Sequence, residues 1–237
     1  MSGRLQDRLA VITGASRGIG RAVALGMAAE GAHVVLVART VGGLEEVDDE
    51  IRKVGGKATL VPLDLTDLAG IDRLGATIFE RWGKLDILIG NAGSLGTLTP
   101  LSHLDPKEWD KTLAINVTAN YRMIRSFEPL LKRSDAGRAV FVTSGAAQKC
   151  QPYWGAYSVT KAALDAMVKT WAAELEKTTV RANLLSPGPT RTAMRKKAMP
   201  GEDPTTLTRP ADLVPLFIEM STPAYTKNGE IVRYEKA

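Results

Sequence analysis

Three side chains in the second half of the chain have the types and spacing needed to move a proton at an oxygen atom. Tyr157 and Lys161 are four residues apart, so a helix would place them on one face. Tyrosine normally ionises near pH ~10, but a nearby ammonium group favours the phenolate. Tyr157 could then act as general acid to a carbonyl or general base to an alcohol. Ser144 could donate a hydrogen bond to the same substrate oxygen.

A tyrosine and a lysine at this spacing occur on many helices by chance, so the rest of the chain must support the interpretation. The first apolar run, residues 9–13, leads into a glycine-rich turn that opens a helical pattern. Glycines let phosphates approach the backbone, and a helix N-terminus offers free N–H groups. We therefore expect a dinucleotide to contact the turn, at Gly14, Ser16, Arg17, Gly18, Ile19 and Gly20.

The end of the second apolar run, residues 33–38, indicates which dinucleotide is bound. An acidic residue there would select NAD by its bonds to the ribose, but this chain has Ala38 followed by Arg39. Arg39 and Arg17 can both pair with a 2′-phosphate, and Arg39 can also stack on adenine. NADP(H) is favoured over NAD. The alternative is that both arginines are solvated surface residues.

The glycine turn is spaced G-x-x-x-G-x-G, which differs from the common G-x-G-x-x-G fingerprint. With Asn91-Ala92-Gly93, Ser144 and the Tyr157–Lys161 pair in this order, the chain resembles the short-chain dehydrogenase/reductase family over residues 7–192. Within that family it resembles the 3-oxoacyl-ACP reductase-like and carbonyl reductase members. The resemblance implies hydride transfer on the B face of the nicotinamide, to or from a carbonyl or secondary alcohol.

The resemblance also implies roles for residues near the adenosine. Asp64 would meet the adenine amino group and Leu65 the adenine ring. Asn91, Ala92 and Gly93 would lie beneath the adenosine ribose and steady the sheet.

Nearer the nicotinamide, the resemblance implies that Tyr157 and Lys161 contact the cofactor and that Lys161 bonds the ribose hydroxyls. Asn116 would be the fourth catalytic residue, mid-helix, its main chain holding a water that links Lys161 to solvent. The backbone of Pro187 and Gly188 would meet the carboxamide. Thr192 is in register with the family threonine, and Thr190 could share its role.

Apolar runs alternate with amphipathic segments along the whole chain. We predict strands at residues 9–13, 33–38, 58–63, 85–89, 138–143, 180–185 and 230–234, and helices at 19–30, 44–54, 71–82, 105–131, 156–176 and 210–220. This alternation is typical of a parallel sheet covered on both faces. We expect one Rossmann-like, doubly wound α/β domain over residues 1–237, with about seven strands and a substrate loop at about 189–209.

Composition narrows the class of protein. The 237 residues carry 31 basic and 26 acidic side chains, a net charge of +5, but the basic residues are scattered, which does not favour nucleic acid. No apolar run is long enough for a membrane span or signal segment. One cysteine, Cys150, fits a reducing compartment, so cytoplasm is expected. Two histidines and one cysteine give a metal site little support.

The substrate is the point at which the sequence stops being informative. Pocket walls are expected from residues 94–98, 146–154 and 194–208, with Trp154 lining the pocket. The basic residues 195–197 could meet an acidic carrier of an acyl thioester or be solvated. Helices 105–131 and 156–176 suit a homodimer or homotetramer. A non-catalytic NADP(H)-binding sensor is the alternative function; a serine hydrolase is disfavoured because no G-x-S-x-G motif surrounds Ser144.

Overall fold

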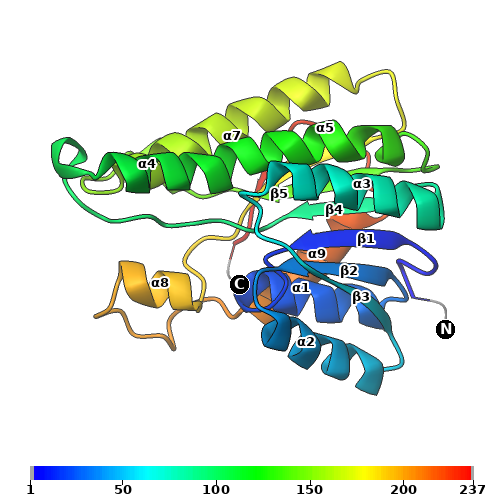
Figure 1. The fold of residues 1–237 in the computed structure, drawn as a ribbon. Coiled ribbons are helices and arrows are strands. Elements are labelled where there is room, and N and C mark those ends of the chain that lie inside the picture. Colours follow the sequence, from blue (N-terminus) through cyan, green and yellow to red (C-terminus); the bar gives the residue numbers. More distant parts are fainter. Residues whose placement is uncertain (1–2, 236–237) are drawn as a thin grey trace.

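The computed structural model describes residues 3–235, which fold around one parallel seven-stranded sheet (Figure 1). Its order is β3-β2-β1-β4-β5-β6-β7, and every neighbouring pair is parallel. The strands are β1 (Leu9–Thr13), β2 (His33–Ala38), β3 (Lys57–Pro62), β4 (Ile87–Gly90), β5 (Arg138–Val142), β6 (Arg181–Ser186) and β7 (Ile231–Arg233). The predicted fold class is confirmed.

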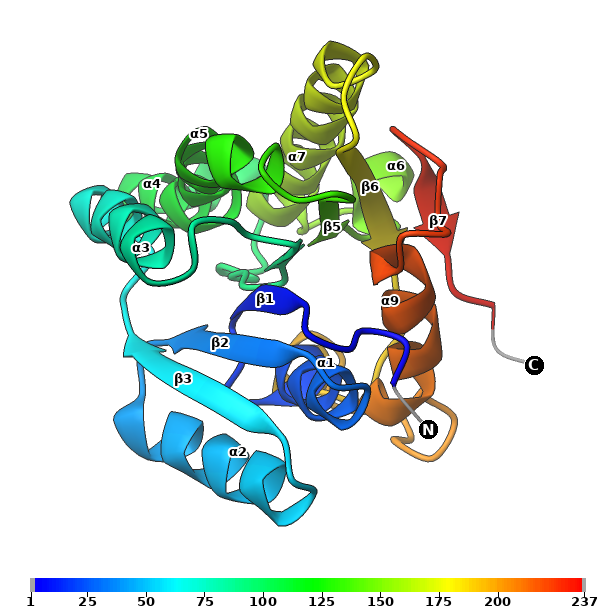
Figure 2. The same cartoon turned by 90° about the vertical axis from the view of Figure 1, so that its right-hand side faces the viewer.

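Helices cover both faces of the sheet (Figure 2). One face carries α3 (Leu68–Trp82), α4 (Pro106–Leu113), α5 (Ala119–Leu131) and α7 (Gly155–Glu174); the other carries α1 (Gly18–Ala29), α2 (Val41–Lys53) and α9 (Val214–Ser221). Each layer has its own apolar core, one packed on α3, α5 and α7 and the other on α1, α2 and α9. β1 is buried at all five positions, which explains its uninterrupted apolar sequence.

The order of the strands in the sheet reverses at the position between β1 and β4, which are neighbours in the sheet. Strands β2 and β3 lie on one side of β1, whereas β4 and the later strands lie on the other. In a doubly wound sheet, such a switch point opens a crevice at the carboxyl ends of the strands. The glycine turn after β1 and the Asn91-Ala92-Gly93 segment after β4 therefore meet there.

The predicted helix 105–131 runs unbroken over residues 106–131, and one correction concerns the hydrogen-bonding pattern inside it. It begins as expected, with the Asp105 side chain accepting a hydrogen bond from the Lys107 N–H at 2.8 Å and with Pro106 in the first turn. A π-helical turn, η2 (Ala114–Thr118), then separates α4 from α5. A single π turn is short and rare and has no sequence signature of its own, so the apolar periodicity of the stretch did not reveal it.

The predicted loop 189–209 also needs correction, because it contains the short helix α8 (Ala193–Ala198). The structure adds α6 (Ala146–Lys149) after β5 and a 3₁₀ turn, η1 (Leu101–His103), before α4. The helix predicted at 210–220 begins as a 3₁₀ turn, η3 (Pro210–Leu213), and continues as α9. Strands β1 and β2 have the predicted bounds, and the other boundaries differ from the predicted ones by at most three residues.

Two negative findings apply to the described part of the chain. No helix within residues 3–235 is long and apolar enough to cross a membrane. Over the same residues, no three histidine, cysteine, aspartate or glutamate side chains group as metal ligands would.

Candidate active site

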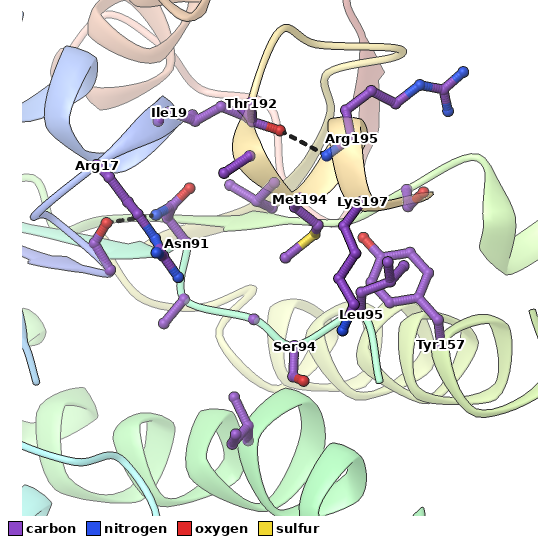
Figure 3. Close-up of a pocket in the computed structure, with 18 of the residues that line it drawn as sticks. Arg17, Ile19, Asn91, Ser94, Leu95, Tyr157, Thr192, Met194, Arg195 and Lys197 are labelled. Carbon is purple, nitrogen blue, oxygen red and sulfur yellow. Dashed lines mark hydrogen bonds between the residues drawn. The ribbon is translucent and has the colours of Figure 1, made fainter. Parts of the chain in front are cut away.

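A cavity of about 830 Å³ lies at the carboxyl ends of the central strands and brings together nearly all the predicted site residues (Figure 3). Those lining it are Gly14, Ser16, Arg17, Gly18, Ile19, Arg39, Asp64, Leu65, Asn91, Ala92, Gly93, Ser144, Tyr157, Lys161, Pro187, Gly188, Thr190 and Thr192. Two predicted residues, Gly20 and Asn116, lie behind this wall and do not line the cavity. The volume is within the range of small-molecule and cofactor sites.

The glycine turn presents bare backbone to the cavity. Gly14 and Gly18 have φ of +66° and +58°, a region in which side chains are strained. Helix α1 begins at Gly18, and no side chain among the described residues caps its N-terminus or places an acid in its first turn. Its free N–H groups and positive dipole end are therefore available to an anion.

Gly20 serves packing and does not contact the cavity. A Cβ at this position would lie 2.2 Å from the Gly14 carbonyl oxygen and 2.5 Å from Asn91 Nδ2. Only a glycine lets α1 approach the turn this closely, so Gly20 has a packing role, and its contact with the cofactor stays a prediction.

Thr13, at the end of β1, fixes the Asn91-Ala92 segment. Its Oγ1 accepts hydrogen bonds from the backbone N–H groups of Asn91 and Ala92, both at 3.0 Å. Asn91 Nδ2 donates to the Thr13 carbonyl at 2.8 Å. The asparagine side chain thus ties β4 to β1, which agrees with the expected steadying of the sheet.

Two arginines stand at the end of the cavity formed by the glycine turn and β2. Arg17 and Arg39 are both exposed, and Arg39 Nη1 lies 3.9 Å from Asp64 Oδ2. Asp64 Oδ1 already accepts hydrogen bonds from the Thr66 N–H and hydroxyl, both at 2.9 Å. The Thr66 backbone bond is the main reason that the pKa of Asp64 is lowered. Only Oδ2 is left for an adenine amino group.

The catalytic candidates lie deep in the cavity, at the ends of β5 and α7. Tyr157 and Lys161 are buried, and the Lys161 Nζ lies 5.7 Å from the centre of the Tyr157 ring. Nζ donates a hydrogen bond of 2.7 Å to the carbonyl oxygen of Val142. Burial lowers the pKa of Lys161 to about 8, with Asp165 acting in the opposite direction.

The expected effect of Lys161 on Tyr157 does not appear in the protein alone. Burial raises the pKa of Tyr157, and a hydrogen bond with Ser144 opposes that shift. Removing the phenolate from water costs more than the hydrogen bond with Ser144 returns. The positive charge of an oxidised nicotinamide, when bound, would also favour the phenolate.

Asn116 lies in the π turn and organises the wall between α7 and the segment after β4. Its Oδ1 accepts from the Ser94 N–H at 2.7 Å, and its Nδ2 donates to the Ser94 carbonyl at 2.8 Å and to Thr160 Oγ1 at 3.0 Å. The Asn116 carbonyl, expected to hold a water, accepts a hydrogen bond of 2.7 Å from Asn120 Nδ2. One of the two lone pairs of that carbonyl remains for a further donor.

The segment after β6 faces the glycine turn. Gly188 adopts φ +68°, and a Cβ on Gly18 would lie 3.4 Å from Thr192 Cγ2. Thr192 Oγ1 caps α8 by accepting from the Arg195 N–H at 3.2 Å (Figure 3). Thr190 is buried and pairs with Thr208, which closes the base of the segment from 189 to 209. Both threonines reach the cavity, so geometry does not separate them.

The substrate walls are narrower than predicted. Of the three expected ranges, only Ser94, Leu95, Gly96, Trp154, Met194, Arg195, Lys197 and Ala198 line the cavity. Trp154 lines the cavity and packs edge-on against Tyr157, with ring centres 5.9 Å apart, so its expected place in the pocket is confirmed.

Two charged residues that were not predicted, Glu108 and Lys111, line the cavity from α4. Their three-residue spacing is the only signal that they share a helix face.

Comparisons with known proteins agree with this geometry. The family profile described as short chain dehydrogenase matches residues 8–203. The oxidoreductase YciK of Escherichia coli K12 is 36% identical over 217 residues, which are 90% of this chain and 86% of that protein. The chain belongs to the short-chain dehydrogenase family, as the sequence resemblance indicated.

Solved structures of the same family superpose closely. A protein described as a short-chain dehydrogenase from Pseudomonas syringae has a TM-score of 0.95 and 37% identity, covering 98% of this chain and 96% of that one. Another from Shigella flexneri 2a, complexed with NADP, has a TM-score of 0.94 and 35% identity, covering 98% and 99%. The chain is therefore an oxidoreductase of this family.

Proposed function

We propose that the protein is an NADP(H)-dependent oxidoreductase that interconverts a carbonyl and a secondary alcohol, with Tyr157 as general acid and base. The observation that carries the proposal is one cavity that joins Ser144, Tyr157 and Lys161 to an uncapped helix N-terminus and a pair of arginines. Reduction of a carbonyl needs a dinucleotide that supplies a hydride and a side chain that supplies a proton, both in contact with the same substrate molecule. This cavity has room for the dinucleotide and contains the proton donor.

The residues present fit NADP(H). The free N–H groups at the start of α1 suit the diphosphate, and Gly14 and Gly18 line the cavity beside them. Arg17 and Arg39 suit a 2′-phosphate, and no carboxylate follows β2 within residues 39–44 to oppose one. The Shigella relative complexed with NADP supports the same choice. Asp64, Leu65, Asn91, Ala92, Gly93, Pro187, Gly188, Thr190 and Thr192 would complete the site.

In the direction of reduction, bound NADPH supplies a hydride, and so two electrons, to the carbonyl carbon. Tyr157 donates its hydroxyl proton to the carbonyl oxygen as negative charge develops there. Ser144 donates a hydrogen bond to the same oxygen and holds it beside Tyr157. The carbonyl π bond becomes a C–H and an O–H bond, and Tyr157 is left as the phenolate. The reverse sequence oxidises the alcohol.

Lys161 restores the proton that Tyr157 has lost. A lysine with pKa about 8 carries its proton at neutral pH and releases it more readily than an exposed lysine. The hydrogen bond to Val142 holds Nζ on the β5 side of the tyrosine. Asn116 fixes Ser94 and Thr160 on either side of this group and so positions the wall beside Lys161.

A sensor that binds NADP(H) without turnover is the second candidate. The buried Tyr157 and Lys161 argue against it, because a binding protein gains nothing from a lysine whose charge is costly to bury. The two functions are separated by following NADPH oxidation at 340 nm over ketones, diketones, aldehydes and acetoacetyl thioesters. Turnover supports the enzyme, whereas NADPH binding without turnover of any compound supports the sensor.

Cytoplasmic location, a single domain and a homo-oligomeric state belong to the same proposal. Tyr121 on α5 and Val159 on α7 are large, exposed side chains, half or nearly half accessible, on the two helices expected to form a dimer. Their exposure supports an interface there. Light scattering of the purified protein measures the oligomeric state directly.

A further inference from the structure

The three basic residues 195–197 have separate surroundings in the folded chain. Arg195 is tied to Glu202 through two contacts of 2.6 Å, from Nε and Nη2 to the two carboxylate oxygens. The Glu202 carboxylate raises the pKa of Arg195. Figure 3 shows the Arg195 guanidinium directed away from Tyr157. The Arg195 charge is therefore already paired with Glu202, and this pair links two parts of the segment from 189 to 209.

Lys196 and Lys197 are adjacent on α8 but face different hollows. Lys196 lines a smaller hollow of about 370 Å³ formed within the loop itself. Lys197 lines the main cavity, and Figure 3 shows its side chain extending from α8 toward Ser94 and Leu95, on the side of the cavity where Tyr157 lies. Of the residues 195–197, Lys197 is therefore the one that brings a charged group toward the catalytic end.

The Lys197 ammonium has no countercharge in the described part of the chain. Among residues 3–235, no ion pair or hydrogen bond involves its Nζ. The cavity wall contains only two carboxylates in this part, and each faces another cation. Asp64 lies 3.9 Å from Arg39, and Glu108 lies 3.9 Å from Lys111.

Apolar side chains accompany Lys197 at the catalytic end. Leu95 is buried, Trp154 packs against Tyr157, and Met194 lies one turn before Lys197 on α8. An apolar wall with one cation at its edge suits a substrate with a hydrocarbon body and a negative group, since the charge is paired while the body is desolvated.

We propose that Lys197 is a specificity-determining residue that binds a negatively charged group, a carboxylate or a phosphate, on the carbonyl substrate. This proposal rests on the proposed function, because it concerns the substrate of the same site. The anionic substrate would place its carbonyl against Ser144 and Tyr157 and its negative group against the Lys197 ammonium. Neutral ketones and aldehydes of the same shape would lack the second contact.

The test compares matched acids and esters in the intact protein with NADPH. The first pair is 4-carboxybenzaldehyde and its methyl ester; the second is 4-oxopentanoate and its methyl ester; dihydroxyacetone phosphate and dihydroxyacetone test phosphate in place of carboxylate. The quantity compared is the ratio of kcat/KM for the charged member to kcat/KM for the neutral one. We expect the wild type to favour the charged member of at least one pair about 10-fold.

Variants on α8 assign that preference to a residue. Lys197→Met is expected to remove most of the roughly 10-fold preference, and Lys197→Glu to reverse it. Lys196→Met is the matched control, since it removes the same charge from the neighbouring residue, and it should keep the wild-type ratio. An equal ratio for wild type and Lys197→Met overturns the proposal. So does a rise in the KM for NADPH that accounts for the whole effect, because Lys197 would then serve the cofactor.

Binding separates the failure of this proposal from failure of the proposed function. Titration calorimetry in the presence of NADP⁺ measures the Kd of 4-(hydroxymethyl)benzoate and of its methyl ester. If nothing is turned over yet the acid binds more tightly through Lys197, the catalytic proposal fails and the anion site stands. If aldehydes are reduced but neither activity nor binding distinguishes acid from ester, the anion site fails alone.

Discussion

The Lys161 Nζ donates a 2.7 Å hydrogen bond to the carbonyl oxygen of Val142, the last residue of β5. This bond ties the catalytic helix α7 to the strand that leads into Ser144. It also fixes a buried ammonium group beside the Tyr157 ring. The strand end and the helix therefore position the three catalytic candidates as one unit.

The low pKa of Lys161 predicts how reduction depends on pH. Burial penalises the charged form, so the lysine loses its proton as the pH rises through about 8, well below the usual value of 10.5. Above that pH the reservoir that reprotonates Tyr157 is empty, and kcat/KM for carbonyl reduction should fall about 10-fold per pH unit. The measurement is a pH profile of kcat/KM from 6 to 10. A profile that stays flat to pH 10 would show that this lysine does not limit the reaction.

Removing the Arg39 side chain should weaken NADPH binding selectively. A charged pair with a 2′-phosphate is worth about 1.5–3 kcal/mol, so Arg39→Ala should raise the Kd for NADPH roughly 10- to 100-fold and leave NADH unchanged. Arg52→Ala is the matched control, because Arg52 is also exposed and pairs with Asp48 on α2. Fluorescence titration with both cofactors measures the effect. Equal losses for NADPH and NADH would exclude recognition of the 2′-phosphate.

Two glycine-to-alanine changes should have opposite effects on stability. A Cβ on Gly20 would overlap the Gly14 backbone, so Gly20→Ala should lower the Tm by several degrees and weaken cofactor binding. Gly42 lies in the first turn of α2 and has nothing within 4 Å of an added Cβ. Gly42→Ala should raise the free energy of unfolding by up to about 1 kcal/mol, so the Tm should stay the same or increase. Thermal melts with and without NADPH compare them; a Tm for Gly20→Ala at or above wild type would contradict the packing argument.

The strands and the catalytic register were predictable because both depend on local signals. Buried parallel strands such as β1 need uninterrupted apolar sequence, and the Tyr157–Lys161 spacing matches a helical face. The glycine turn likewise has few alternatives once a strand precedes it and a helix follows. These features predicted most of the residues that line the cavity, including Ser144, Tyr157 and Lys161.

Other features depend on distant parts of the chain, which no local pattern reports. Arg138 begins β5 and looks like a surface arginine, yet it is buried and donates to the carbonyls of Thr179, Thr222 and Pro223. Burial lowers its pKa to about 10. Its partners come from segments more than 40 residues away. The separation of Lys196 from Lys197 was hidden as well, because the hollows that they face are formed by other parts of the chain.

The proposed mechanism depends most directly on the Tyr157 hydroxyl. The substitution Tyr157→Phe removes this hydroxyl and keeps the ring against Trp154. The decisive measurement is kcat for NADPH oxidation at 340 nm with a carbonyl compound that the wild type accepts, alongside the Kd for NADPH. We predict that kcat falls by about 10²- to 10⁴-fold, the usual contribution of a general acid, while NADPH affinity stays within a few-fold of wild type. Wild-type kcat in Tyr157→Phe would contradict the proposed mechanism.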